Sequence, residues 1–130
     1  MTERELVNAA IDATKRAYAP YSGFFVGAAL LADNGKVYIG CNIENSSYSV
    51  TNCAERTALF TAIADGARKF TAIAIAGGKG GEIGSPCPPC GVCRQALSEF
   101  CYKDLKILLA KKDGYDEYTL GELLPKSFEL

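Results

Sequence analysis

The chain has 130 residues, six cysteines and no histidine, with 48% hydrophobic and 22% charged residues and a formal net charge of -1. This length is enough for one domain, residues 1–130, which can bury a core without disulfide bonds, and the small net charge excludes binding to nucleic acids or membranes by bulk charge attraction. The absence of histidine excludes every mechanism that uses an imidazole as a base or a metal ligand.

The amino-terminal third predicts a helix followed by a hairpin. Thr2 and Glu5 have the spacing of a capping box, and apolar residues then recur on one helical face until Pro20 ends the pattern. The pair Asn34-Gly35 readily takes the positive φ angles of a tight turn, which favours a β-hairpin around it. The two strands of this hairpin are expected at 27–32 and 36–42.

Two junctions between a loop and a helix come next, and both carry cysteines. Apolar residues resume helical spacing after Cys53, so this residue stands at the start of a helix that ends near Gly66. The apolar segment 70–76 has the length and composition of a strand covered on both faces, in the middle of a sheet. A loop rich in Gly and Pro leads into the next helix, and its first part, 77–81, is expected to be a flexible connection near the mouth of the site.

The remaining pattern completes an α/β architecture. Residues 105–110 form another apolar strand, and 120–124 are expected to form a short helix before a tail that contains Phe128. The order α, β, β, α, β, α, β predicts a three-layer α/β/α domain, in which the hairpin is joined to parallel strands by crossover helices.

The role of the cysteines depends on the cellular compartment in which the protein is expected to lie. The first ten residues do not resemble a signal peptide, and no apolar run is long enough to span a bilayer. We therefore expect a soluble, cytoplasmic protein whose thiols stay reduced. In that setting the cysteines indicate a metal site or catalysis rather than a disulfide framework.

The cysteine spacing predicts a metal site with three protein ligands. Cys87, Cys90 and Cys93 follow one another at intervals of three, and two thiolates at such an interval at a helix start can bind one ion. Equivalent junctions of successive β-α units lie side by side, so Cys53 can reach the same ion. A fourth tetrahedral position then remains for water, as in catalytic zinc sites.

Two charged residues follow Cys53 closely. Glu55 lies in the first turn of the same helix, where its carboxylate can approach the fourth ligand position without binding the metal, so it is a candidate proton shuttle. Arg56 can hydrogen-bond the thiolate sulfurs and withdraw the excess negative charge of three thiolates, which restores the acidity of a bound water.

These residues carry a family resemblance. The segments Cys53-Ala54-Glu55-Arg56 and Pro89-Cys90-Gly91-Val92-Cys93-Arg94-Gln95 closely resemble the small, all-cysteine class of zinc-dependent cytidine deaminases. Further matching motifs stand in the family's order along nearly the whole chain, at 21–22, 24, 26–29, 42–45, 124–125 and 128.

The resemblance implies a fold and an activity. The fold would be an α/β/α sandwich with a mixed five-stranded sheet. The chain would bind Zn²⁺ and catalyse hydrolytic deamination of cytidine and 2'-deoxycytidine to uridine and 2'-deoxyuridine, with release of ammonia, in pyrimidine salvage. Glu55 would take a proton from water, pass it to N3 of the base and then protonate the departing amine.

The resemblance also implies how the small-molecule nucleoside would be bound. Asn42 and Glu44 would bind the ribose hydroxyls, Phe24 would line the nucleoside pocket, and the backbone near Ala54 would read the pyrimidine edge. Phe128 would reach from a neighbouring subunit to stack on the base, which implies a homotetramer with shared active sites.

Three alternatives remain at this point. Cys87 and Cys90 also fit the metal-binding spacing, although Pro88 and Pro89 between them supply no amide donors, so Cys90 and Cys93 are favoured. Cys87 is then an extra thiol beside the site, and the two other cysteines are expected to be small buried side chains. The chain could also deaminate another aminopyrimidine nucleoside, such as blasticidin S, or be a non-catalytic module stabilised by zinc.

Overall fold

The computed structural model describes all residues from 1 to 130 and contains one mixed sheet with the strand order β2-β1-β3-β4-β5. The strands are β1 (Phe24–Ala32), β2 (Val37–Cys41), β3 (Phe70–Lys79), β4 (Lys106–Lys111) and β5 (Gly114–Thr119). The helices are α1 (Glu3–Ala13), α2 (Ala54–Ala64), α3 (Gly91–Phe100) and α4 (Leu120–Leu123). None of the helices has the length and hydropathy of a membrane-spanning segment.

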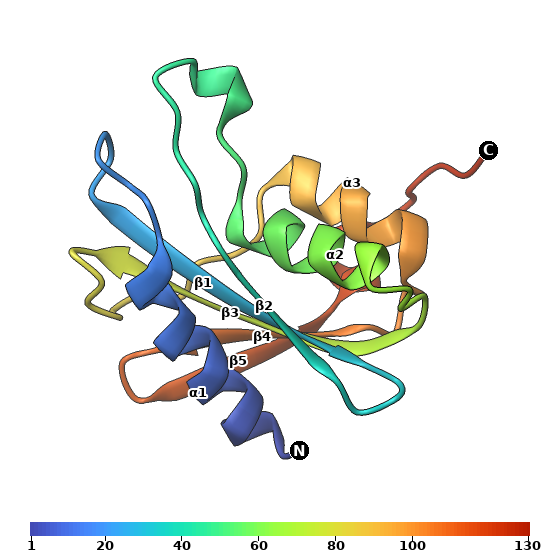
Figure 1. Cartoon of the computed structure of the whole chain (residues 1–130). Coiled ribbons are helices and arrows are strands. Elements are labelled where there is room, and N and C mark those ends of the chain that lie inside the picture. Colours follow the sequence, from blue (N-terminus) through green and yellow to red (C-terminus); the bar gives the residue numbers. More distant parts are fainter.

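Helices cover both faces of this sheet (Figure 1). Alternate residues of each buried strand point to opposite faces. In β1, Ala28 and Leu30 belong to the core cluster that includes residues of α2 and α3, whereas Ala29 belongs to the cluster that includes residues of α1. The predicted three-layer α/β/α architecture is therefore confirmed.

The central strand is longer than predicted. Strand β3 lies in the middle of the sheet, as expected, but it continues to Lys79 because 77–79 pair antiparallel with 24–26 of β1. The expectation of a flexible connection over 77–81 is therefore wrong for its first three residues. The turn begins at Gly80 and Gly81, which have φ angles of 66° and 83°.

Strand β1 pairs antiparallel with both β2 and β3, and β3 pairs parallel with β4, so β2, β3 and β4 run in the same direction. Helices α2 and α3 connect these three strands, so the predicted hairpin joined to parallel strands by crossover helices is confirmed. The sheet differs from the residue-based prediction at one edge. Strand β5 is absent from the predicted order of elements, although the family resemblance implied five strands. It is an edge strand of mostly polar residues that are all at least partly exposed, so it lacks the apolar run by which the other strands are recognised.

The first helix is shorter than predicted. It begins with the predicted capping box of Thr2 and Glu5 but ends at Ala13, and a short 3-10 turn follows over Thr14–Arg16. The Thr14 hydroxyl donates to the carbonyl of Ile11 at 2.6 Å. A threonine side chain that bonds the preceding turn in this way competes with the regular helical pattern.

Gly40 of β2 allows α2 to lie directly on the sheet. A Cβ atom at this position would stand 2.3 Å from the carbonyl oxygen of Ala54 and 2.4 Å from the backbone nitrogen of Ala58. Both atoms belong to the first turns of the helix that carries Glu55. The missing side chain therefore sets how closely this helix start approaches β2.

We expect Gly40→Ala to destabilise the protein by about 1 to 3 kcal/mol, because the added methyl group meets backbone atoms that cannot rotate away. Urea unfolding followed by circular dichroism measures this change. The matched control is Gly84→Ala, where a Cβ would have no neighbour within 4 Å. Equal unfolding midpoints for the two variants would contradict the prediction.

Candidate active site

Three thiols meet at the starts of two helices. Cys53 is the N-cap residue of α2 and Cys90 is the N-cap residue of α3, one turn before Cys93. The three sulfur atoms all lie within 4.8 Å of one another, and those of Cys53 and Cys90 are 3.8 Å apart. A tetrahedral zinc ion with Zn–S bonds of about 2.3 Å would place its sulfurs about 3.8 Å apart. The donor set therefore fits zinc.

The fourth cysteine near this site lies outside the cluster. Cys87 is half-buried and packs against the main core, where a Cβ added to Gly77 would stand 3.0 Å from both its sulfur and the ring of Phe24. Burial raises the pKa of the Cys87 thiol to about 11. Cys41 and Cys101 are also half-buried, so the expectation that they are small buried side chains is wrong as to their burial.

Glu55 is a buried carboxyl group in the first turn of α2. Its exposed fraction is only 4%, and burial raises its pKa to about 7. The negative charge of Cys53 acts in the same direction. A carboxyl group with this pKa can both accept and release a proton near neutral pH.

Arg56 directs its guanidinium group at the thiols. Its Nη2 donates to the sulfur of Cys53 at 3.2 Å, while its Nε is buried without a hydrogen-bond partner. Hydrogen bonds from Cys93 and Arg56 lower the pKa of Cys53 to about 5, although burial opposes this shift. The pKa of Cys93 is raised, chiefly because it shares a hydrogen bond with Cys53. One of the two thiols thus ionises readily.

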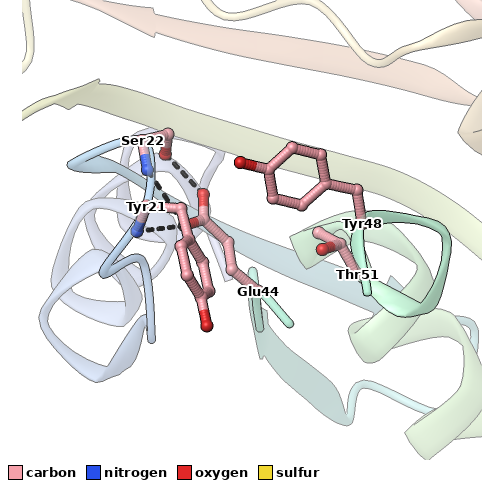
Figure 2. A pocket seen from close by; sticks show the side chains of 5 residues that line it. All are labelled: Tyr21, Ser22, Glu44, Tyr48 and Thr51. Carbon is pink, nitrogen blue, oxygen red and sulfur yellow. Dashed lines mark hydrogen bonds between the residues drawn. The ribbon is translucent and has the colours of Figure 1, made fainter. Parts of the chain in front are cut away.

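A pocket of about 380 Å³ opens between the turn before β1 and the loop that joins β2 to α2 (Figure 2). Glu44 accepts hydrogen bonds in it from the backbone N–H groups of Tyr21 at 2.9 Å and Ser22 at 3.1 Å, and from the Ser22 hydroxyl. The Ser22 hydroxyl is the main cause of the lowered pKa of Glu44, which keeps the carboxylate ionised. The pocket is lined by Tyr21, Ser22, Glu44, Tyr48 and Thr51.

The loop that carries Glu44 is closed next to the thiol cluster. Ile43 and Asn52 exchange two backbone hydrogen bonds of 3.0 Å, so the loop begins and ends at one point, immediately before Cys53. The ring of Tyr48 in this loop meets the ring of Tyr21 edge-on, with the two centroids 6.0 Å apart. Figure 2 shows Tyr48 on the side of the pocket opposite the turn that holds Glu44.

The other predicted substrate residues lie in different surroundings. Asn42 is buried, and its amide group accepts from the Val26 N–H at 2.9 Å and donates to the Phe24 carbonyl at 2.8 Å, so it is largely engaged by β1. Phe24 contacts the region of Cys87 and does not line the pocket of Glu44. Ala54 is fully buried between Cys53 and Glu55.

Phe128 is not brought to this pocket within the chain. Its side chain is 67% exposed, on a carboxyl-terminal tail that extends away from the sheet and helices (Figure 1). The tail borders a separate cavity of about 540 Å³ beside the end of α3.

The comparisons with known proteins agree with this geometry. Residues 1–109 match the family described as cytidine and deoxycytidylate deaminase zinc-binding region. The chain belongs to this deaminase family.

Relatives of this deaminase include curated proteins and a solved structure. The chain is 48% identical to a cytidine deaminase of Sporosarcina psychrophila, over 98% of this chain and 92% of the relative, and 49% identical to one of Halalkalibacterium halodurans, over 98% and 95%. The crystal structure of cytidine deaminase from Burkholderia pseudomallei has a TM-score of 0.91 and 47% identity, with 98% of this chain and 100% of that chain covered.

Sequence reasoning did not identify most of the pocket lining of this deaminase. Tyr21 and Ser22 belong to a family motif, yet their spacing did not indicate that they hold Glu44. Thr51 carried no signal, and Tyr48 had no assigned role. The reason is that the pocket joins two segments more than 20 residues apart, and no local pattern reports such a contact.

Proposed function

We propose that the chain catalyses the zinc-dependent hydrolytic deamination of cytidine and 2'-deoxycytidine to uridine and 2'-deoxyuridine, with release of ammonia, in pyrimidine salvage. The observation that carries this proposal is the buried carboxyl group of Glu55 at the same helix start as the three-thiol cluster. A structural zinc site has no use for such a group. The names of the relatives support cytidine as the substrate.

The proposed metal ligands are Cys53, Cys90 and Cys93. When bound there, Zn²⁺ supplies a Lewis acid that makes a water molecule acidic enough to react at neutral pH. All six cysteines are free, and the ligand thiols need to stay reduced, so a cytoplasmic location is part of the proposal.

Glu55 is proposed as the only proton carrier. It would take a proton from the attacking water, deliver it to N3 of the cytosine ring, and pass the second proton to the leaving amine. Its pKa of about 7 suits this double role, because neither protonation state is strongly disfavoured at neutral pH. The burial that raises this pKa also keeps bulk water from competing for the proton.

Arg56 is proposed to reduce the charge on the thiolates through its contact with Cys53. We expect Arg56→Gln to lower kcat/KM for cytidine about 10- to 100-fold and to weaken zinc binding, because loss of a hydrogen bond to a metal ligand has effects of this size. Steady-state kinetics and zinc titration with a competing chelator measure the two effects. The control is Arg68→Gln, since the hydrogen bonds of Arg68 go to the carbonyl groups of Ile63 and Ala67, at and just beyond the end of α2 away from the thiols. Equal losses in both variants would refute the role.

The nucleoside is proposed to bind between the thiol cluster and the pocket of Glu44. The ionised Glu44 carboxylate would accept a hydrogen bond from a ribose hydroxyl. Asn42 would contribute the amide hydrogen and lone pair that β1 leaves unused. Phe24 would line the part of the nucleoside site that lies outside the pocket of Glu44, and the backbone at Ala54 would read the pyrimidine edge.

A homotetramer with shared active sites completes the proposal. The exposure of Phe128 on an extended tail supports it, because a large aromatic side chain in that position is suited to packing against a second chain. In that assembly Phe128 of one subunit would stack on the base held by another.

The decisive experiment is ammonia release by the zinc-loaded protein. We expect turnover of cytidine and 2'-deoxycytidine, and little turnover of free cytosine, which lacks the sugar that Glu44 would bind. Blasticidin S is the fourth compound to compare. Turnover of blasticidin S alone would replace the proposed substrate, and no turnover of any of the four would reject the activity.

A further inference from the structure

Arg94 links two carbonyl groups that belong to different parts of the chain. It lies in the first turn of α3, and its Nε donates to the carbonyl oxygen of Pro89 at 2.8 Å. Its Nη1 donates to the carbonyl oxygen of Leu123, the last residue of α4, at 2.7 Å. Arg94 takes part in none of the salt bridges of the structure, so its guanidinium group serves the backbone.

The backbone before Cys90 needs a hydrogen-bond donor from elsewhere in the chain, such as the side chain of Arg94. Pro88 and Pro89 have no N–H group, so this stretch can be held by hydrogen bonds only through its carbonyl oxygens. Pro89 is fully buried, where an unpaired carbonyl is unfavourable. The backbone N–H of Arg94 also donates to the carbonyl of Cys90 at 3.0 Å. Arg94 therefore holds the two carbonyl groups on either side of the Cα atom of Cys90.

The contact with Leu123 connects the same arginine to the carboxyl-terminal segment. Leu123 ends α4, and the tail with Phe128 begins directly after it. The hydrogen bond crosses 29 residues of sequence, which makes it a tertiary contact rather than a helix cap. A displacement of α4 would thus displace Arg94 and, through it, the carbonyl group of Pro89, which directly precedes Cys90.

We propose that Arg94 is a positioning residue that fixes the backbone of Cys90 and couples it to the end of α4. The role is distinct from that of Arg56, because Arg94 contacts backbone oxygens and no sulfur. The inference rests on the proposed function in so far as Cys90 is a zinc ligand. The coupling of the backbone at Cys90 to the end of α4 does not depend on whether the protein is active.

Arg68 provides a matched control within the same chain. Its Nη1 also donates to two carbonyl oxygens, those of Ile63 at 2.9 Å and Ala67 at 2.8 Å, but at the end of α2 away from the thiols. A lysine in place of either arginine keeps the positive charge but loses the planar, multiple donors that bridge two carbonyls. Arg94→Lys and Arg68→Lys thus each remove a guanidinium group that bridges two carbonyl groups, one near the thiols and one away from them.

The test measures the rate at which zinc-loaded full-length protein releases zinc to a chromogenic chelator. We expect release from Arg94→Lys to be about tenfold faster or more, and release from Arg68→Lys to stay within about twofold of the wild-type rate. Hydrogen exchange measured by mass spectrometry is the second readout. Amides at 90–94 and 124–130 should exchange faster in Arg94→Lys and remain unchanged in Arg68→Lys.

Each outcome decides the proposal. Zinc release from Arg94→Lys at the rate of the control would overturn it, as would faster exchange at only one of the two segments. If Arg94→Lys does not fold, Arg94→Gln is measured in its place, and failure of both variants would make Arg94 a general stability residue instead. If the wild-type protein retains no zinc or does not deaminate cytidine, the proposed function fails, and exchange in the metal-free protein still decides the coupling.

Discussion

Glu55→Gln is expected to lower kcat for cytidine about a thousandfold while the protein keeps its fold and its zinc. The substitution keeps the size of the side chain and removes the group that would carry both protons, and general acid-base catalysis contributes about 10² to 10⁴ in rate. Ammonia release measures kcat, and metal analysis of the same sample measures zinc. The exposed fraction of Glu55 is only 4%, so bulk water has little access to its position.

The control for this variant is Glu99→Gln, since Glu99 is an exposed carboxylate on the neighbouring helix α3. It should retain wild-type turnover. Substantial activity in Glu55→Gln, with zinc bound, would show that another group moves the protons. Loss of zinc from Glu55→Gln would instead mean that Glu55 acts on the metal site itself.

Cys93→Ser is expected to lose most of its zinc, whereas Cys87→Ser should retain it. The sulfur of Cys93 belongs to the cluster that fits one ion, and the sulfur of Cys87 does not. Loss of a ligand should lower kcat/KM by more than the roughly 100-fold that loss of an outer hydrogen bond costs. Zinc content by metal analysis and cytidine turnover measure both variants side by side.

This pair of variants also tests the two overlapping cysteine spacings. If Cys87→Ser lost zinc and Cys93→Ser kept it, the ligand pair would be Cys87 and Cys90. The buried position of Cys93 adds a second expectation, because a buried hydroxyl group costs more desolvation than a thiol and so lowers stability, whereas Cys87 is only half-buried. A thermal melt without zinc separates this stability effect from loss of the ligand.

Much of the site was predictable because its signals are local. A cysteine one residue before a helix, followed by Glu55 and Arg56, places three groups within one turn. The interval between Cys90 and Cys93 is itself one helical turn, and the structure does place these two sulfurs beside that of Cys53. The prolines between Cys87 and Cys90 supply no N–H donors and so favoured the pair Cys90 and Cys93, whose sulfurs the structure places in the cluster with that of Cys53.

The errors fall where long-range pairing prevails over local preference. Gly77 and Gly78 belong to a sequence that favours a loop, but pairing with β1 draws them into the central strand. The polar residues of β5 form a strand because β4 offers them an edge. The prediction that Asn42 binds the ribose stays a prediction, but its local sequence did not indicate that its amide also bonds the backbone of β1, which lies beside it only in the folded chain.

The chemistry of this protein follows from its amino-acid sequence: three thiols and no imidazole, one carboxyl group beside them, an arginine next to the thiols, and the order of most helices and strands. These are properties of residue types and of spacings within one or two helical turns. Tertiary structure alone decided that Glu44 is held by the Tyr21-Ser22 turn, that Gly40 lets α2 lie directly on β2, and that Arg94 joins the Cys90 loop to α4. Such contacts join residues far apart along the chain, and only the packing of helices against a common sheet brings them together.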